Sequence, residues 1–301
     1  MSLVASELLR VRSRRLVKVL AGLALIGIVV AVVIGAVQSE RPGAGVVAEA
    51  ERQAERAFAD CMAQDAFGAV EPGGDVEGFC RQHADPALFL GEQPLRLSEL
   101  VEIVRGVAFI AILIGLVIGA SAVGASWQRG TMTTILTWEP RRVRVALVRA
   151  SVVAVVTIAL VAALLGVFVA LFWLATSVRG LTSTPAGWGS ELAGVVARVS
   201  LLAGAASIIG GAIAMLGRHT AAALGAVFVY LTVVEGIVRG LRPALSRLML
   251  GDNIAAVVIG DGVRIGDGTS ITLLHAAVTV AVYTFGLLAV ATVSFRIRDV
   301  Q

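Results

Sequence analysis

Six apolar stretches, each long enough to cross a lipid bilayer, constrain this chain more than any other feature. A helix needs about 20 mainly apolar residues to span the hydrocarbon core, and in lipid its backbone amides must bond within the segment. Barrel strands are about 10 residues long and alternate in polarity, which these stretches do not. We therefore predict an all-α integral membrane protein with six transmembrane helices. The predicted spans are residues 19–37, 106–124, 150–175, 199–216, 220–238 and 271–295.

The composition agrees with this prediction. Hydrophobic residues make up 57% of the chain and charged residues 15%, whereas a soluble domain carries about 25% charged residues. Six helices and their connections use most of the 301 residues, so we expect one transmembrane domain over residues 1–301. A pI near 9.8 would suggest nucleic acid in a soluble protein. Here topology explains the charge, and we expect no nucleic-acid partner.

The positions of the charges predict the orientation. If the N-terminus is inside, the cytoplasmic segments are rich in arginine and hold only Glu7, Glu139 and Asp299 as acidic residues. Cytoplasmic loops of membrane proteins have this bias. With six spans, both termini then face the cytoplasm. Lys18 is the only lysine among 25 basic residues, which suggests a high-GC bacterial source. We expect a multi-pass protein of the bacterial cytoplasmic membrane.

Residues 1–18 precede the first span and combine leucines with Glu7 and an arginine cluster. We predict an amphipathic elbow helix on the inner leaflet, its basic side facing anionic membrane lipid. The alternative is a simple positively charged anchor. A cleaved signal peptide is disfavoured, because its apolar region is usually 7 to 15 residues long and this one is longer.

Residues 38–99 form the longest polar segment and are predicted to lie outside. Apolar residues recur there at helical spacing on both sides of a Pro-Gly-Gly turn at 71–75, which predicts a helical hairpin. Cys61 and Cys80 are the only cysteines and lie on opposite sides of the turn. A disulfide is favoured in an oxidising compartment. The alternatives are two free thiols or a metal pair with His83, an incomplete zinc site, and we expect no metal.

The outer loop at 239–270 contains a second pattern. Leucines at helical spacing over 241–248 predict a short interfacial helix. Two copies of Ile-Gly-Asp-Gly follow, at 259–262 and 265–268. Because a β-helix needs at least three coils, two copies predict a tight hairpin or turns. A calcium site is the alternative, but the spacing fits no EF-hand loop.

The cytoplasmic loop at 125–145 carries the main functional signal. Gly130 should end a helix and Thr131 can cap the next one, in which Met132, Ile135 and Leu136 share one face. Pro140 should end that helix, before Arg141 and Arg142. A short amphipathic helix of this kind suits docking into a groove of a soluble partner. The alternative is a connecting loop with an interfacial helix.

In this loop the chain resembles the permease subunits of ABC-2 type transporters. Their pattern is approximately Glu-aromatic-x-x-Gly-Thr, several residues, then Pro and one or two Arg. Trp127, Gly130, Thr131, Pro140, Arg141 and Arg142 follow it in order. The chain departs at Ser126, where the family often has Glu. The basic elbow, six spans and long first outer loop match the family layout.

The resemblance implies a permease, most often an exporter, that pairs with a second permease copy or homologue and with two cytosolic ATP-binding cassette ATPase subunits. The helix from about Arg129 to Leu136 would be the coupling helix. The chain is not expected to be an enzyme. A P-loop needs Gly-x-x-x-x-Gly-Lys-Ser/Thr, and Lys18 lies between two valines. The partner would bind ATP and Mg²⁺, and this chain would need no cofactor.

Polar residues inside the spans are candidates for a translocation path, because such groups are costly in lipid. They are Arg198, Tyr230, Glu235, His275 and Tyr283. The alternative is that they snorkel or pair locally. Small residues in the fourth span, including Gly204 and Gly210, predict a packed interior helix. An ATP-independent secondary transporter, and a membrane sensor or scaffold that uses the outer loop, are the alternative functions.

Overall fold

The structure is a computed structural model that describes residues 3–39, 43–63, 76–90, 94–131, 137, 141–260, 262–264 and 270–297. Its contacts group the chain into two units. The first comprises Met1–Gly27, Val101–Val167 and Gly187–Gln301, and the second comprises Ile28–Leu100 and Phe168–Ala186. The expected single domain over the whole chain stays a prediction, and each unit is described by itself.

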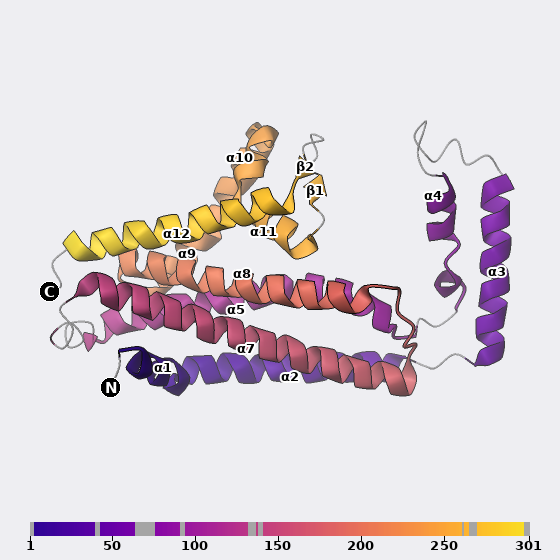
Figure 1. Ribbon diagram of the computed structural model, residues 1–301, viewed down its shortest axis with the longest axis horizontal. Helices are drawn as coiled ribbons and strands as arrows, with labels where there is room; N and C mark the ends of the chain where they lie inside the picture. Colours follow the sequence, from indigo (N-terminus) through magenta and orange to yellow (C-terminus); the bar gives the residue numbers. More distant parts are fainter. Residues whose placement is uncertain are drawn as a thin grey trace. The chain divides into compact units, whose positions relative to one another are not determined.

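Six helices are long and apolar enough to cross a membrane, which confirms the predicted spans and indicates a multi-pass membrane protein. They are α2 (Arg15–Gln38), α5 (Leu100–Gln128, preceded by the 3₁₀ turn η3, Leu97–Glu99), α7 (Arg142–Arg179), α8 (Trp188–Gly217), the continuous α9–η4–α10 (Thr220–Val229, Tyr230–Val234 and Glu235–Leu241) and α12 (Leu273–Ile297). Figure 1 labels these helices. Within the fifth span, η4 is a short π-helical segment, a feature that is rare and frequently found at functional sites.

Shorter elements connect the spans. They are α1 (Leu3–Ser13), α3 (Ala44–Ala63), α4 (Val76–His83), η2 (Pro86–Phe89), η5 (Pro243–Leu248), α11 (Leu250–Ile259), β1 (Val263–Arg264) and β2 (Ser270–Ile271). The predicted interfacial helix at 241–248 is a 3₁₀ helix, η5, and the sequence analysis missed α11 behind it. β1 pairs with β2 in antiparallel register, as the predicted hairpin requires. The second Ile-Gly-Asp-Gly copy, at 265–268, lies outside the described residues.

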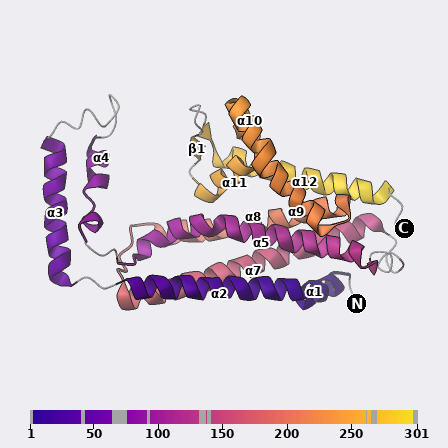
Figure 2. The ribbon, with the colours of Figure 1, turned by 180° about the vertical axis from the view of Figure 1, so that it is seen from behind.

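α8 is the interior helix of the first unit, as its small residues predicted. In the most apolar stretch of α8, 72% of the residues are buried, whereas in the corresponding stretch of α2 only 6% are buried. Figures 1 and 2 both show α8 alongside α5 and α12. Gly115 and Gly119 of α5 face the carbonyl oxygens of Ala203 and Ser207 so closely that a Cβ on either glycine would overlap them. The register rises along both helices together, so α5 and α8 run parallel, as the second and fourth spans must.

In the second unit, hydrogen bonds close the base of the segment 38–99, which is predicted to be an outer loop. The Leu95 amide donates to Ser39 Oγ at 2.9 Å, and that hydroxyl donates to the carbonyl of Arg179 at 3.0 Å. The Leu181 amide then donates to the carbonyl of Leu95 at 2.8 Å. The two ends of the loop are therefore tied to each other and to the end of α7.

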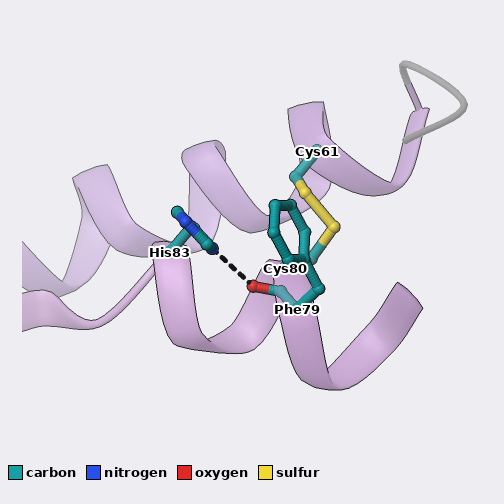
Figure 3. The surroundings of a disulfide bond; sticks show 4 residues. All are labelled: Cys61, Phe79, Cys80 and His83. Atoms are coloured by element: carbon teal, nitrogen blue, oxygen red, sulfur yellow. Dashed lines mark hydrogen bonds between the residues drawn. A yellow bond between two sulfur atoms is a disulfide. The ribbon is translucent and has the colours of Figure 1, made fainter. Parts of the chain in front are cut away.

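The segment 38–99 contains the predicted helical hairpin, with α3 and α4 side by side (Figure 1). The structure joins Cys61 of α3 to Cys80 of α4 through a disulfide, with a Cα–Cα distance of 5.7 Å. His83 donates from Nδ1 to the carbonyl of Phe79 at 2.9 Å, as Figure 3 shows. Among the described residues there is no group of three metal-ligating side chains.

Candidate functional site

The segments predicted to be cytoplasmic meet at one end of the first unit. The junction of α1 and α2 contacts the end of α5 through Arg14 and Ser121. The end of α5 contacts the end of α12 through Trp127 and Phe295. A membrane protein whose connections follow the predicted order would bring these segments together on one side.

The elbow α1 is fastened to the start of α7 by a buried ion pair. Arg149 Nη2 lies 3.0 Å from Glu7 Oε1, and Arg149 Nε lies 3.3 Å from Glu7 Oε2. Arg149 is 1% exposed and Glu7 is 3% exposed. Arg10 donates to the same carboxylate at 2.8 Å. The sequence analysis missed this pair, although an acidic residue inside a basic amphipathic segment was a usable signal.

Arg14 lies at the break between α1 and α2 and binds the end of α5. Its Nη1 donates to the carbonyl of Ser121 at 2.7 Å and its Nη2 to that of Ala122 at 2.9 Å. These carbonyls lie in the C-terminal part of α5, so the charge complements the negative end of the helix dipole. Burial, with a smaller contribution from the Arg149 charge, lowers the pKa of Arg14 to about 10, and it stays cationic at neutral pH.

The predicted coupling loop begins where α5 ends. Gly130 has φ +64°, a left-handed conformation that suits glycine and ends the helix as expected. The Thr131 hydroxyl donates back to the carbonyl of Ser126 at 3.1 Å, so it caps the preceding helix. Met132, Ile135, Leu136 and Pro140, which define the predicted coupling helix, lie outside the described residues. Their role stays a prediction.

Trp127, at the base of this loop, contacts side chains from the α8–α9 turn and from α12. The guanidinium of Arg218, between α8 and α9, lies 4.8 Å from the centre of its ring, within cation–π range. Phe295, near the end of α12, meets the ring edge to face at 5.9 Å. Arg141 and Arg142, at the far end of the loop, line a cavity of about 280 Å³ together with Arg296. Trp127 therefore joins the end of α5 to the α8–α9 turn and to the end of α12.

Two of the predicted path residues meet directly. The hydroxyls of Tyr230 and Tyr283 are 2.9 Å apart, and Tyr283 also donates to the carbonyl of Leu248 at 3.3 Å. Tyr230 is the first residue of the π-helical segment η4. The tyrosine pair therefore joins the fifth span, the sixth span and η5.

Glu235 lies buried in the fifth span, one residue past η4, with 2% of its surface exposed. Its carboxylate oxygens accept from the Gly251 amide at 3.0 and 3.2 Å. This amide belongs to the first turn of α11, where a negative charge is stabilised by the helix dipole. Arg239, one helical turn further along, binds Asp252 at 2.8 Å and lies 4.0 Å from Glu235.

Cations lie at the opposite end of α11. Arg105 Nη2 donates to the carbonyl of Ile259 at 3.2 Å. The guanidinium of Arg198 packs against Gly260, where a Cβ would lie 2.6 Å from its Nη2. An acid at the N-terminal end and two arginines at the C-terminal end match the dipole of this short helix.

His275 is exposed and its Nε2 donates to the carbonyl of Arg247 in η5 at 2.9 Å. Each of the five path candidates thus has a local contact. Glu235 contacts α11, Arg198 contacts Gly260 just after α11, and His275 contacts η5. Tyr230 and Tyr283 contact each other. These contacts agree with the local-pairing alternative. A translocation path through them stays a prediction.

Comparison of the whole chain with protein-family models, with curated proteins and with solved structures yields no match. The functional argument therefore rests on the residues and on their arrangement.

Proposed function

We propose that this chain is the membrane-spanning permease subunit of an ATP-driven exporter, similar to ABC-2 type permeases. In this proposal it resides in a bacterial cytoplasmic membrane, pairs with a second permease copy or homologue, and binds cytosolic ATPase subunits through residues 129–142. The ATPase binds ATP and Mg²⁺ and performs the hydrolysis.

One observation carries the proposal. Trp127 stands at the base of the loop and contacts both Arg218 and Phe295. A partner that pushes or pulls on the loop acts through this side chain on the α8–α9 turn and on α12. Such a connection is what a transporter needs if a soluble motor is to move its membrane helices, because two sites couple only through an element that both can bias.

Co-purification tests the proposal. The chain is extracted from its native membrane in detergent and pulled down, and bound ATPase activity is measured. We expect a stoichiometric ATPase partner, which is lost when Met132, Ile135 and Leu136 are all changed to Asp. The matched control changes Leu241, Leu245 and Leu248 to Asp, since these leucines are exposed in the predicted outer loop. A folded protein without an ATPase partner would overturn the proposal.

A second test concerns coupling rather than docking. Trp127→Ala should leave the ATPase bound but reduce the stimulation of its activity by the permease. Trp173→Ala is the matched control, because Trp173 is exposed on α7. Equal effects of the two substitutions would argue against transmission through Trp127.

An ATP-independent secondary transporter is the second candidate, and one observation favours it. Glu235 is a buried carboxylate within a membrane span, and such groups mark proton and ion pathways. Proteoliposomes that contain this chain alone would then take up protons along a pH gradient. Glu235→Gln would abolish this uptake. No uptake by the reconstituted chain would remove this candidate.

A further inference from the structure

A basic cavity of about 590 Å³ lies where the α1–α2 junction meets the end of α5. Four arginines contribute to its wall, three from the N-terminal segment and one from the residue just after α5. They are Arg10, Arg14, Arg15 and Arg129. Ser126 and Thr131 belong to the same wall, and none of the described residues that line the cavity is acidic.

The arginines are only partly satisfied by the protein. Arg14 is fixed by the carbonyls of Ser121 and Ala122, yet its Nε is buried with no hydrogen-bond partner. Arg15 and Arg129 are exposed and make no ion pair with any residue that the structure describes. Among the described residues, Arg10 is the one arginine of the four that pairs with a carboxylate, that of Glu7. Glu7 also forms an ion pair with Arg149. The cavity therefore concentrates positive charge that an anion can neutralise.

Burial and the neighbouring charges change the pKa of Arg14. The pKa of Arg14 is lowered mainly by burial and further by the positive charges of Arg149, Arg129 and Arg10, whereas the Glu7 carboxylate raises it. A bound anion would relieve this repulsion, and guanidinium groups are well suited to phosphate because they donate two parallel hydrogen bonds.

The position of the cavity, at the start of α2, indicates which kind of anion it can bind. Arg15 is the first residue of the first membrane span, α2. Leu16 lines the cavity, and Val19 and Leu23, which follow it on α2, are more than half exposed. The cavity thus lies at the start of the first candidate span, beside an apolar helix surface on which an acyl chain can lie.

We propose that this cavity binds the phosphate of an anionic phospholipid from the cytoplasmic leaflet. The headgroup phosphate lies among Arg14, Arg15 and Arg129, and the acyl chains follow the exposed face of α2. The site does not rest on the ATP-driven function, because a lipid between the elbow and α5 would serve any membrane protein of this fold.

Binding to the purified full-length chain tests the proposal. Short-chain phosphatidylglycerol, short-chain phosphatidylcholine and inorganic phosphate are titrated separately, with calorimetry and native mass spectrometry as readouts. We expect saturable binding of one phosphatidylglycerol per chain and at least about tenfold weaker binding of phosphatidylcholine. Inorganic phosphate that binds as tightly as phosphatidylglycerol would assign the site to a free phosphate and overturn the lipid proposal.

Two double variants, each lacking two positive charges, locate the site. Arg15→Gln with Arg129→Gln should weaken phosphatidylglycerol binding at least about tenfold. Arg12→Gln with Lys18→Gln should change it less than about twofold, because these exposed residues occupy the same segment but do not line the cavity. Unchanged melting temperatures would show that both variants fold. Equal weakening in the two variants would mean diffuse surface attraction and would overturn the site.

Discussion

Glu7 of α1 and Arg149 of α7 form an ion pair that is almost entirely withdrawn from solvent, with Arg149 Nη2 3.0 Å from Glu7 Oε1. The residues are 142 positions apart, so the pair decides where the elbow lies on the first unit. Burying two charges is costly, and the pair is stable only because each charge compensates the other. Breaking it from one side leaves a buried charge without its main partner.

We therefore expect Arg149→Met to lower the free energy of unfolding by about 3 to 5 kcal/mol, since Glu7 would stay buried. Glu7→Gln combined with Arg149→Met should cost less than the sum of the two single substitutions. Thermal unfolding in detergent measures these differences. Arg12→Met, at an exposed position of α1, is the control and should change stability by less than about 0.5 kcal/mol. Additive single effects would contradict the pairing.

The crossing of α5 and α8 predicts a strong dependence on side-chain size. A Cβ at Gly119 would overlap the carbonyl of Ser207, so Gly119→Ala should force the helices apart and cost about 1 to 3 kcal/mol or more. Gly166→Ala on α7, where no atom lies within 4 Å of the added Cβ, should be neutral or stabilise by up to about 1 kcal/mol. Melting temperatures of the two variants, compared side by side, provide the measurement. A stable Gly119→Ala protein would contradict the close contact.

Glu235 anchors the start of α11, and the chemistry of this contact predicts a graded response. Glu235→Gln keeps an oxygen that can accept from the Gly251 amide and should retain most of the stability. Glu235→Ala removes the acceptor and should cost about 1 to 2 kcal/mol, as the loss of a helix cap does. Hydrogen exchange of the α11 amides is the readout, with faster exchange expected for Glu235→Ala. Equal exchange in both variants would show that the carboxylate is not the anchor.

The disulfide between Cys61 and Cys80 closes a loop with a sequence separation of 19 residues. In the chain-entropy model, a loop of this size contributes about 3 kcal/mol to stability. Cys61→Ser should therefore make α3 and α4 more susceptible to limited proteolysis, and reductant should have the same effect on the unmodified protein. Cys80→Ser should match Cys61→Ser. Resistance of the reduced hairpin would mean that its other contacts suffice.

The spans were predictable because lipid imposes one requirement on every segment that crosses it. Long apolar runs can satisfy their backbones only as helices, and the glycines of the fourth span indicated that it packs in the interior. The antiparallel pairing of β1 with β2 was predictable because glycine-rich repeats between two short apolar segments favour a chain reversal.

α11 was missed for a physical reason. Its 10 residues are too few to cross a membrane, and its stability depends on Glu235, Arg105 and Arg198, which come from three different spans. The Glu7–Arg149 pair was missed because sequence patterns reveal only residues at local spacing, and these two residues are 142 positions apart. The path candidates were chosen by their cost in lipid, but the partners that offset this cost were not visible in the sequence.

The glycine crossing between α5 and α8 also limits how this protein can change shape. Backbone in contact with backbone over two turns has no side chains that could slide or rotate to take up a displacement. We therefore expect α5 and α8 to move together as one rigid body. Hinges would then lie elsewhere in the chain, and Gly130, just after the end of α5, is one such position.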